Sequence, residues 1–373
     1  MELFKKRLKV FFLLVIIFVS CCTKQHSGEI QTTSTDNMSI IEQDKTEQMS
    51  DPLILDGRPF IGSSGKMYKN DEAHLIEFLG CNFNSDADRW YSLEGIEQLY
   101  NLKKIQVYGE NLAIVDLIPL ASLSSLEELS ISGNITRLPD LTGLENLRSI
   151  TITGSKLEGL DGISALNARR IEIETENALD SLAPLNNLLY LEYLNIRSKG
   201  EKTYRIAEMS NLPSLKKIIL NFWGGAKIDF RGIENMTVLE ELWAGWTEPF
   251  NIEGIGTLTN LKILSINLIS SEPSLEFMRD MPNINAVYLH ADCMAPEREY
   301  DFPARTEAYQ ILDVSPLTTL KNLQTLSCIN FIIKNIVSLD VLNIQDYIDL
   351  IGSRLYYETE KSKHTLWFEN PNG

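Results

Sequence analysis

A repeat of 21 to 24 residues runs through most of the chain and constrains its fold more than any other feature. Three segments show it when aligned: GIEQLYNLKKIQV (residues 95–107), PLNNLLYLEYLNI (184–196) and GIGTLTNLKILSI (254–266). In each segment apolar residues follow one another at intervals of three, three, three and two positions. The last apolar position recurs at Val107, Ile131, Ile152, Ile173, Ile196, Leu220, Ala244, Ile266 and Leu289, and a tenth unit (316–328) follows after a longer gap. Ten matches in phase indicate true repetition.

The spacing within each unit predicts its local structure. The final alternation of polar and apolar residues is typical of a short strand, and the preceding leucines, three apart, pack inward as the chain turns back. No unit can close a core alone, so each must stack on its neighbours. We therefore predict an α/β solenoid shaped as a curved horseshoe, with a parallel β-sheet on the concave face and an irregular or short-helical convex side.

In the spacing of their apolar positions, residues 91–328 resemble the bacterial leucine-rich repeat family, most closely its internalin-type units. They make up roughly two-thirds of the chain. The resemblance implies a binding platform. The family's asparagine ladder survives only as Asn134, with residues such as Glu110, Glu176 and Trp223 at the equivalent positions. The fourth unit is one residue short and has Ala168 in place of a leucine. An insertion at 291–315 is expected to bulge as a loop or short helix.

The ends of a solenoid need covers that keep water from the terminal cores. Residues 51–90 are the expected N-terminal cap, with a helix over 72–80. Residues 329–373 are the expected C-terminal cap and tail.

The N-terminal segment predicts export and anchoring. Basic residues precede an apolar run over 10–19, which is too short to span a bilayer as a helix, since that takes about 20 residues. This pattern is typical of a secretory signal over 1–20, and Phe18-Val19-Ser20-Cys21 resembles a lipobox, which implies a lipid on Cys21. A signal cleaved without lipid attachment and an uncleaved anchor are the alternatives. Residues 21–50 are polar and predict a flexible tether with a reach of roughly 30 Å. We therefore expect the protein to be lipid-anchored in a bacterial cell envelope, on the outer membrane or the cell surface.

Net charge limits the classes of partner that the chain can bind, and the cysteine spacing limits its metal sites and disulfides. The net charge is −17 and becomes about −20 without the basic signal segment, which disfavours nucleic acids and anionic lipid surfaces as partners. A basic protein is the better match, and the N-terminal lipid is the only membrane contact expected. Beyond Cys21 and Cys22, Cys81, Cys293 and Cys328 lack metal-site spacing. We expect buried free thiols. One disulfide among these three cysteines is the alternative.

The register also predicts which side chains face the concave side. The central position of each strand is Gln106, Ser130, Thr151, Glu172, Asn195, Ile219, Trp243, Ser265, Tyr288 and Ser327. Apolar patches and aromatic anchors are typical of protein interfaces. We predict a protein-binding face with apolar anchors Tyr193, Ile219, Trp243, Ile263 and Tyr288, where Glu172, Glu174 and Glu241 set a preference for a basic partner. The alternatives are that the insertion or C-terminal segment covers this patch, or that Trp243 and Tyr288 stack on sugar rings.

No catalytic motif occurs in the sequence, so we expect a protein that is not an enzyme and uses no cofactor, metal or small-molecule substrate. The acidic run at 84–90 lacks the glycine and final glutamate of a calcium loop. His290, Asp292 and Cys293 make a weak case for a metal site. The predicted function is protein binding through the concave face, with adhesion or host interaction as one setting. The rivals are a self-associating envelope protein and an enzyme carried by the insertion and C-terminal segment.

Overall fold

The computed structural model describes residues 51–62, 65–84, 89–154, 156–164, 166–268, 273–291, 310–329, 331–335, 346–347, 354–359 and 362–365. These residues belong to one compact unit, and within them no helix has the length and hydropathy needed to cross a membrane. The predicted signal segment, Cys21, the tether, Asp292 and Cys293 all lie outside the described residues.

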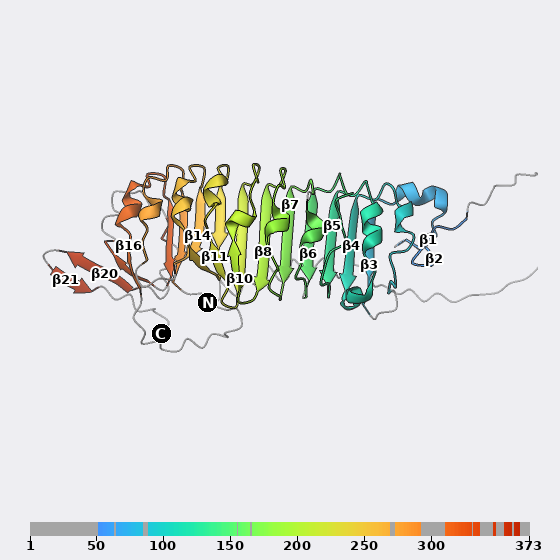
Figure 1. The fold of residues 1–373 in the computed structure, drawn as a ribbon, viewed down its shortest axis with the longest axis horizontal. Coiled ribbons are helices and arrows are strands. Elements are labelled where there is room, and N and C mark those ends of the chain that lie inside the picture. The colour runs from blue at the N-terminus through green and yellow to red at the C-terminus, as the bar shows by residue number, and fades with distance from the viewer. Residues whose placement is uncertain are drawn as a thin grey trace, which may run out of the picture. The chain divides into compact units, whose positions relative to one another are not determined.

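Twelve strands form one parallel sheet, each paired with its neighbour from the adjacent repeat (Figure 1). In chain order they are β3 (Phe78–Asn82), β4 (Lys104–Gly109), β5 (Glu128–Gly133), β6 (Ser149–Gly154), β7 (Arg170–Thr175), β8 (Tyr193–Lys199), β10 (Lys217–Trp223), β12 (Glu241–Ala244), β14 (Ile263–Asn267), β15 (Ala286–His290), β17 (Thr325–Ile329) and β19 (Asp346–Tyr347). The ten predicted units supply β4 to β17. Strands β3 and β19 add one strand at each end of the sheet.

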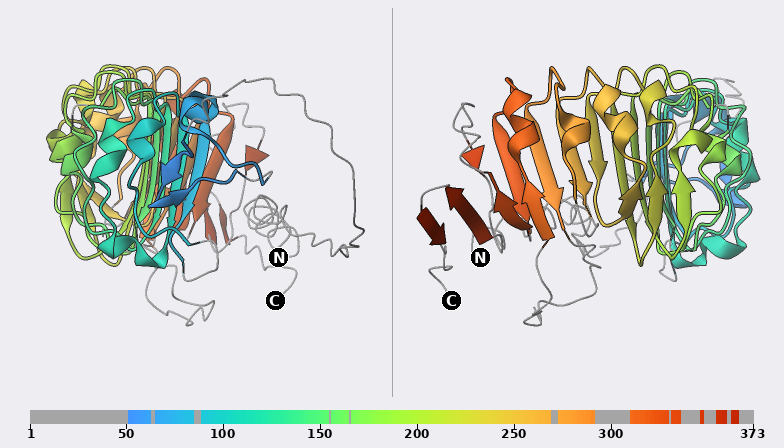
Figure 2. Two further views of the ribbon diagram at one scale, coloured as in Figure 1. Left: turned by 90° about the vertical axis from the view of Figure 1, so that its right-hand side faces the viewer. Right: turned by 60° about the vertical axis from the view of Figure 1, so that its left-hand side comes forward.

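The register of the sheet follows the sequence period. Val107 pairs with Ile131 and Ile131 with Ile152, and these last apolar residues are fully buried. The end-on view in Figure 2 shows successive turns stacked in line. Equivalent residues therefore form continuous rows across the sheet, as the period predicts.

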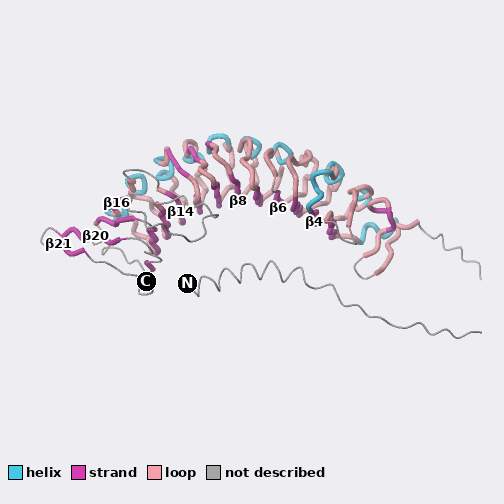
Figure 3. Tube along the Cα trace, turned by 90° about the horizontal axis from the view of Figure 1, so that it is seen from below, coloured by secondary structure: helices cyan, strands magenta, loops and turns pink. Residues whose placement is uncertain are grey.

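Short 3₁₀ helices occupy the convex side, and no α-helix occurs in the described part of the chain (Figure 3). They are η1 (Asn70–Leu75), η2 (Ile96–Gln98), η3 (Glu110–Ile114), η4 (Ile118–Ser122), η5 (Asp161–Ile163), η6 (Ala183–Leu185), η7 (Ile206–Glu208), η8 (Ile233–Asn235), η9 (Glu253–Thr257), η10 (Glu276–Met278) and η11 (Ser315–Thr319). A 3₁₀ helix has three residues per turn, which is the spacing of the leucines in each unit. That match places successive leucines on the core side.

Several repeats carry a second strand away from the concave face. Three of these strands, β9 (Thr203–Arg205), β11 (Lys227–Asp229) and β13 (Glu248–Phe250), form a parallel sheet. A further sheet contains β16 (Gln310–Asp313), β18 (Phe331–Lys334), β20 (Arg354–Thr359) and β21 (Ser362–Thr365). The N-terminal region adds the antiparallel pair β1 (Ile54–Leu55) and β2 (Arg58–Pro59).

Asparagines on the turns join each repeat to the one before it. In five repeats the residue before the third leucine position is an asparagine whose Nδ2 donates to a backbone carbonyl of the preceding turn, over 2.7–3.0 Å: Asn101, Asn146, Asn260, Asn283 and Asn322. The ladder position recognised in the sequence, Asn134, donates to the carbonyl oxygen of Glu110 over 3.2 Å. The convex asparagines form a second ladder that the sequence analysis missed.

Two local predictions were wrong. The expected helix over 72–80 is a 3₁₀ turn that ends at Leu75, followed by strand β3. Exposure alternates along β3, and its residues pair with β4 from Phe78 to Asn82, so pairing with the sheet outweighs local helical tendency. The end of the insertion, expected as a loop or short helix, forms strand β16.

Two of the three cysteines expected as buried free thiols match that prediction. Cys81 and Cys328 are buried and unbridged. Burial raises the pKa of the Cys328 thiol to about 12, and it raises the pKa of Cys81 as well. Both thiols are therefore protonated and unreactive in the folded protein near neutral pH.

Candidate functional site

The concave face carries three rows of side chains that run across the strands. The central row is Gln106, Ser130, Thr151, Glu172, Asn195, Ile219, Trp243, Ser265, Tyr288 and Ser327, as the sequence register predicts. The row changes character at Ile219. Small or polar residues occupy the first five strands, and large apolar residues gather on β10 to β15.

A stacked pair of aromatic rings is the main feature of the apolar half. The rings of Trp243 and Tyr288 lie 5.5 Å apart between centroids, with 23° between their planes. They come from strands β12 and β15, which β14 separates. The intervening residue is Ser265, which is only 6% exposed. Its small side chain leaves the space in which the two rings meet above it.

Polar contacts hold Trp243 in place. Its indole Nε1 donates to Glu241 Oε2 over 3.1 Å. Lys217 Nζ lies 2.5 Å from the same carboxylate oxygen and 5.7 Å from the centre of the Trp243 ring. Desolvation raises the pKa of Glu241, but the hydrogen bonds from Lys217 and Trp243 outweigh it and leave that pKa below its ordinary value. Glu241 is thus ionised and orients the indole.

The other two predicted glutamates also have a cation beside them. Glu172 pairs with Arg170 over 2.7 Å, and Glu174 pairs with Arg197 over 3.6 Å. The Arg170 guanidinium lies 3.7 Å from the centre of the Tyr193 ring. Because each carboxylate is balanced within the sheet, these glutamates offer less net charge to a partner than their number suggests. Their role in selecting a basic partner stays a prediction.

The structure brings most, but not all, of the predicted anchors together. Ile219 and Trp243 are paired neighbours, and Ile263 pairs with Glu241 at the edge of the same patch. Tyr193 shares the row of Ile263, but Lys217 and Glu241 lie between them. All five predicted anchors are half-buried. We define the aromatic patch as Ile219, Trp243, Ile263 and Tyr288, with Tyr193 at its margin.

One polar residue within the central row was not singled out from the sequence. Asn195 is 7% exposed, and its Oδ1 has no hydrogen-bond partner. Its Nδ2 lies 3.4 Å from Glu172 Oε2. Burial here results from the large neighbours on both sides, which a single-residue pattern does not reveal.

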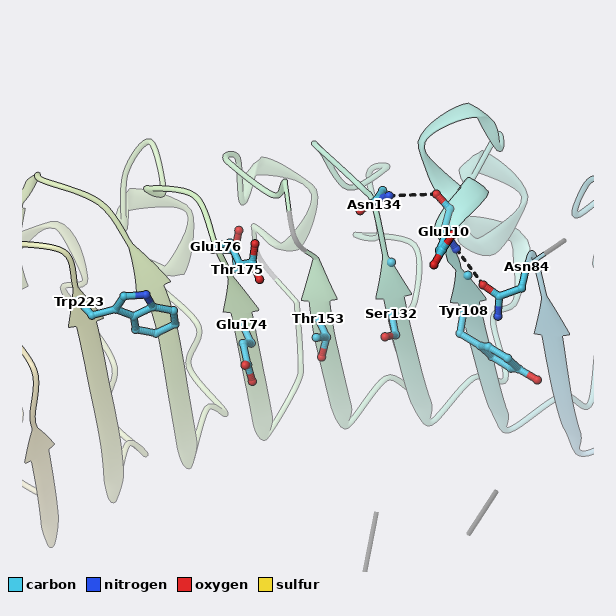
Figure 4. Close-up of a pocket in the computed structure, with 12 residues that line it drawn as sticks. Asn84, Tyr108, Glu110, Ser132, Asn134, Thr153, Glu174, Thr175, Glu176 and Trp223 are labelled. Atoms are coloured by element: carbon cyan, nitrogen blue, oxygen red, sulfur yellow. Dashed lines mark hydrogen bonds between the residues drawn. The ribbon is translucent and has the colours of Figure 1, made fainter. Parts of the chain in front are cut away.

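A groove of about 450 Å³ crosses the C-terminal ends of β4 to β7, reaches Trp223 at the end of β10, and was also missed (Figure 4). Tyr108 and Trp223 stand at its two ends, with Ser132 and Thr153 between them. Its carboxylates are Glu110, Glu174 and Glu176. The sequence signal was the replacement of ladder asparagines by Glu110, Glu176 and Trp223, which was interpreted only as a departure from the family pattern.

The described residues contain no group of three or more histidine, cysteine or acidic side chains arranged to hold a metal ion. His290 is half-buried on β15, and burial lowers its pKa. Its two proposed companions, Asp292 and Cys293, lie outside the described residues.

No family model matches the sequence, and no curated protein matches it either. Among solved structures, a chain of the mouse RP105/MD-1 complex is 18% identical with a TM-score of 0.52, covering 74% of this chain and 47% of its own length. An internalin (InlF) of Listeria monocytogenes is also 18% identical, with a TM-score of 0.47, covering 76% of this chain and 91% of its own. This chain spans about half of the mouse chain. By its parallel sheet, its stacked turns and the mouse structure, the chain has the leucine-rich repeat solenoid fold.

Proposed function

We propose that this protein is a lipid-anchored, extracytoplasmic binding protein that holds another protein on its concave face. The observation that carries the proposal is the stacked pair of Trp243 and Tyr288 on the central row of the sheet. Half-buried aromatic rings on an otherwise polar face are the usual anchors of protein interfaces. Ile219 and Ile263 widen the apolar surface around them.

The scaffold suits this role because it holds the patch in advance. Parallel pairing fixes the backbone of every strand that contributes to it, and Glu241 fixes the indole of Trp243. Side chains that are ordered before binding lose little conformational entropy when the partner arrives. The ion pair of Lys217 with Glu241 supplies a polar border, which is typical of protein interfaces.

The N-terminal sequence supports the anchoring part of the proposal. The lipobox-like Phe18-Val19-Ser20-Cys21 provides the attachment point, and the polar tether over 21–50 separates the repeat domain from the membrane by roughly 30 Å. A solenoid held at that distance presents its concave face to proteins at the cell surface. Adhesion is one such setting.

Site-specific photo-crosslinking tests the binding face. A photoreactive phenylalanine at Asn221, beside the aromatic patch, is expected to yield one dominant protein adduct in cells that express the chain. The same group at Glu145, an exposed residue in the turn before β6, is the matched control and should yield none. Trp243→Ala should remove the Asn221 adduct.

The outcomes separate the proposal from its rivals. Equal crosslinking from both positions, or an adduct that persists in Trp243→Ala, would refute the concave binding face. An adduct of twice the chain mass would show self-association in place of a different partner.

Two measurements test anchoring and exposure. Cys21→Ser should move the protein from the membrane fraction to the soluble fraction, and no redistribution would argue against lipid attachment. Protease added to intact cells should remove the repeat domain while a periplasmic control survives. Protection of the domain would place the partner inside the envelope.

A further inference from the structure

The groove at the strand ends differs in charge from the rest of the concave face. We call it the acidic groove and define it by Tyr108, Glu110, Thr153, Glu174, Glu176 and Trp223 (Figure 4). Elsewhere on this face the glutamates are paired, as in Glu128 with Lys104, Glu172 with Arg170 and Glu241 with Lys217. Within the groove, Glu174 is paired as well, with Arg197. Among the described residues, the side chains of Glu110 and Glu176 form no ion pair or hydrogen bond.

The position of these two glutamates in the repeat explains why they are unpaired. Glu110 and Glu176 stand at the ladder position that Asn134 occupies in its own repeat. Asn134 directs its amide to the preceding turn, where it donates to the Glu110 backbone carbonyl. A carboxylate cannot donate, so a glutamate in that position cannot make this bond. Both glutamates are exposed, and their charge is available to a ligand.

Two aromatic side chains make the groove more than a charged surface. Tyr108 is 41% exposed at one end, and Trp223 stands at the other (Figure 4). An aromatic face attracts an arginine or lysine side chain through cation–π contact, most strongly when the ring is tryptophan. The combination of a carboxylate and a ring near each end matches a cationic side chain at each end.

The strand spacing sets the distance between these two positions. Glu110 follows β4 and Glu176 follows β7, three strand steps apart in the sheet, which is about 14 Å at the usual spacing. An extended peptide advances about 3.3 Å per residue, so four residues span about 13 Å. Residues four apart also project from the same side of such a peptide.

We propose that the acidic groove binds an extended segment of the protein partner with two arginine or lysine residues four positions apart. The segment crosses the strand ends from Tyr108 toward Trp223. Its first cation lies near Glu110 and Tyr108, and its second lies near Glu174, Glu176 and Trp223. The inference rests on the proposed function, because it assigns part of the same concave face, and it places the preference for a basic partner at these glutamates.

Lys199 lies between Glu176 and Trp223 in the ladder row, because β8 stands between β7 and β10. Trp223 therefore reaches the groove from beyond Lys199, and it lines the groove together with Glu174 and Glu176.

Two synthetic peptides of identical composition test the spacing. The probe is acetyl-Gly-Arg-Ser-Gly-Ser-Arg-Gly-amide, and the control is acetyl-Gly-Ser-Gly-Arg-Arg-Ser-Gly-amide. Binding to the full chain is measured by titration at about 0.01 M ionic strength, where screening is weak. The spaced peptide is expected to bind about tenfold more tightly, because the adjacent peptide reaches one end of the groove at a time. Equal affinities would overturn the proposal.

Charge-removing variants test the site. Glu110→Gln and Glu176→Gln should each weaken the spaced peptide by about three- to fivefold, whereas Glu145→Gln, an exposed glutamate outside the groove, should leave its affinity unchanged. Identical circular dichroism spectra would show that the variants fold. An unchanged affinity in both groove variants would also overturn the proposal.

Measurements on the aromatic patch separate a failure of the groove proposal from a failure of the proposed function. Trp243→Ala should leave the peptide affinity unchanged while it removes the crosslink from Asn221. If the peptides fail to discriminate and the crosslink remains, the groove assignment alone is wrong. If the crosslink fails and the peptide preference remains, the aromatic patch is wrong and the groove stands by itself.

Discussion

Substitution of Gly133 by alanine is the sharpest test of how the repeats stack. Gly133 ends β5 with a φ of 155°, and it pairs with Gly109 at the end of β4. An added Cβ would lie 2.1 Å from the Gly109 carbonyl oxygen and 2.9 Å from Leu112 Cδ1. The first of these contacts is with backbone, which cannot turn aside as a side chain would. The two strands must therefore separate where they form the floor of the groove.

The magnitude follows from two contributions. Overpacking a well-packed site costs about 1–3 kcal/mol, and holding a residue with a side chain in a backbone region that favours glycine adds about 1–3 kcal/mol. We expect Gly133→Ala to lower the free energy of unfolding by about 2–6 kcal/mol. Urea denaturation followed by circular dichroism measures this difference through the midpoint and slope.

Gly80→Ala is the matched control in the neighbouring region of the same sheet. Gly80 lies in β3, and an added Cβ meets no atom within 4 Å. Because alanine restricts the unfolded chain more than glycine does, this variant should match or slightly exceed the wild type, by up to about 1 kcal/mol. The reasoning fails if Gly133→Ala unfolds within about 0.5 kcal/mol of the wild type, or if both variants lose equal stability.

Three further predictions concern other parts of the solenoid. Asn146→Ala removes a hydrogen bond between adjacent turns and should lower the free energy of unfolding by about 0.5–1.5 kcal/mol in urea; no loss would show that water replaces the bond fully. The hydrogen bonds from Arg231 hold the pKa of buried Asp229 well below its usual 3.8, so this carboxylate stabilises the fold above about pH 4 and less as the pH falls toward its folded pKa. Asp229→Asn should therefore flatten the decline of the urea midpoint between about pH 5 and pH 2, and an unaltered pH profile would contradict this assignment. Thiol labelling followed by peptide mass spectrometry should modify Cys81 and Cys328 only after denaturant is added, and labelling of either in native buffer would contradict their burial.

Much of the candidate site could be predicted from the sequence because the repeat sets the register. Once Val107 and its equivalents are assigned to the core, every second residue of each strand must face the concave side. The register alone therefore places Trp243 and Tyr288 in one row. Ala168 did not disturb the period, and it is buried in the core at the position where a leucine was expected.

The tertiary structure alone decided how neighbouring rows interact. Stacking of Trp243 on Tyr288 depends on the small size of Ser265 between them. Glu174 and Glu241 take their cations from the adjacent strand, whereas Glu172 pairs within its own strand. Strand β3 formed because β4 offered an edge to pair with, which the local sequence does not show. The repeat pattern is local and determines which way a side chain points. Partners on adjacent strands come from turns more than twenty residues away in the sequence, so these contacts are set only when the turns stack.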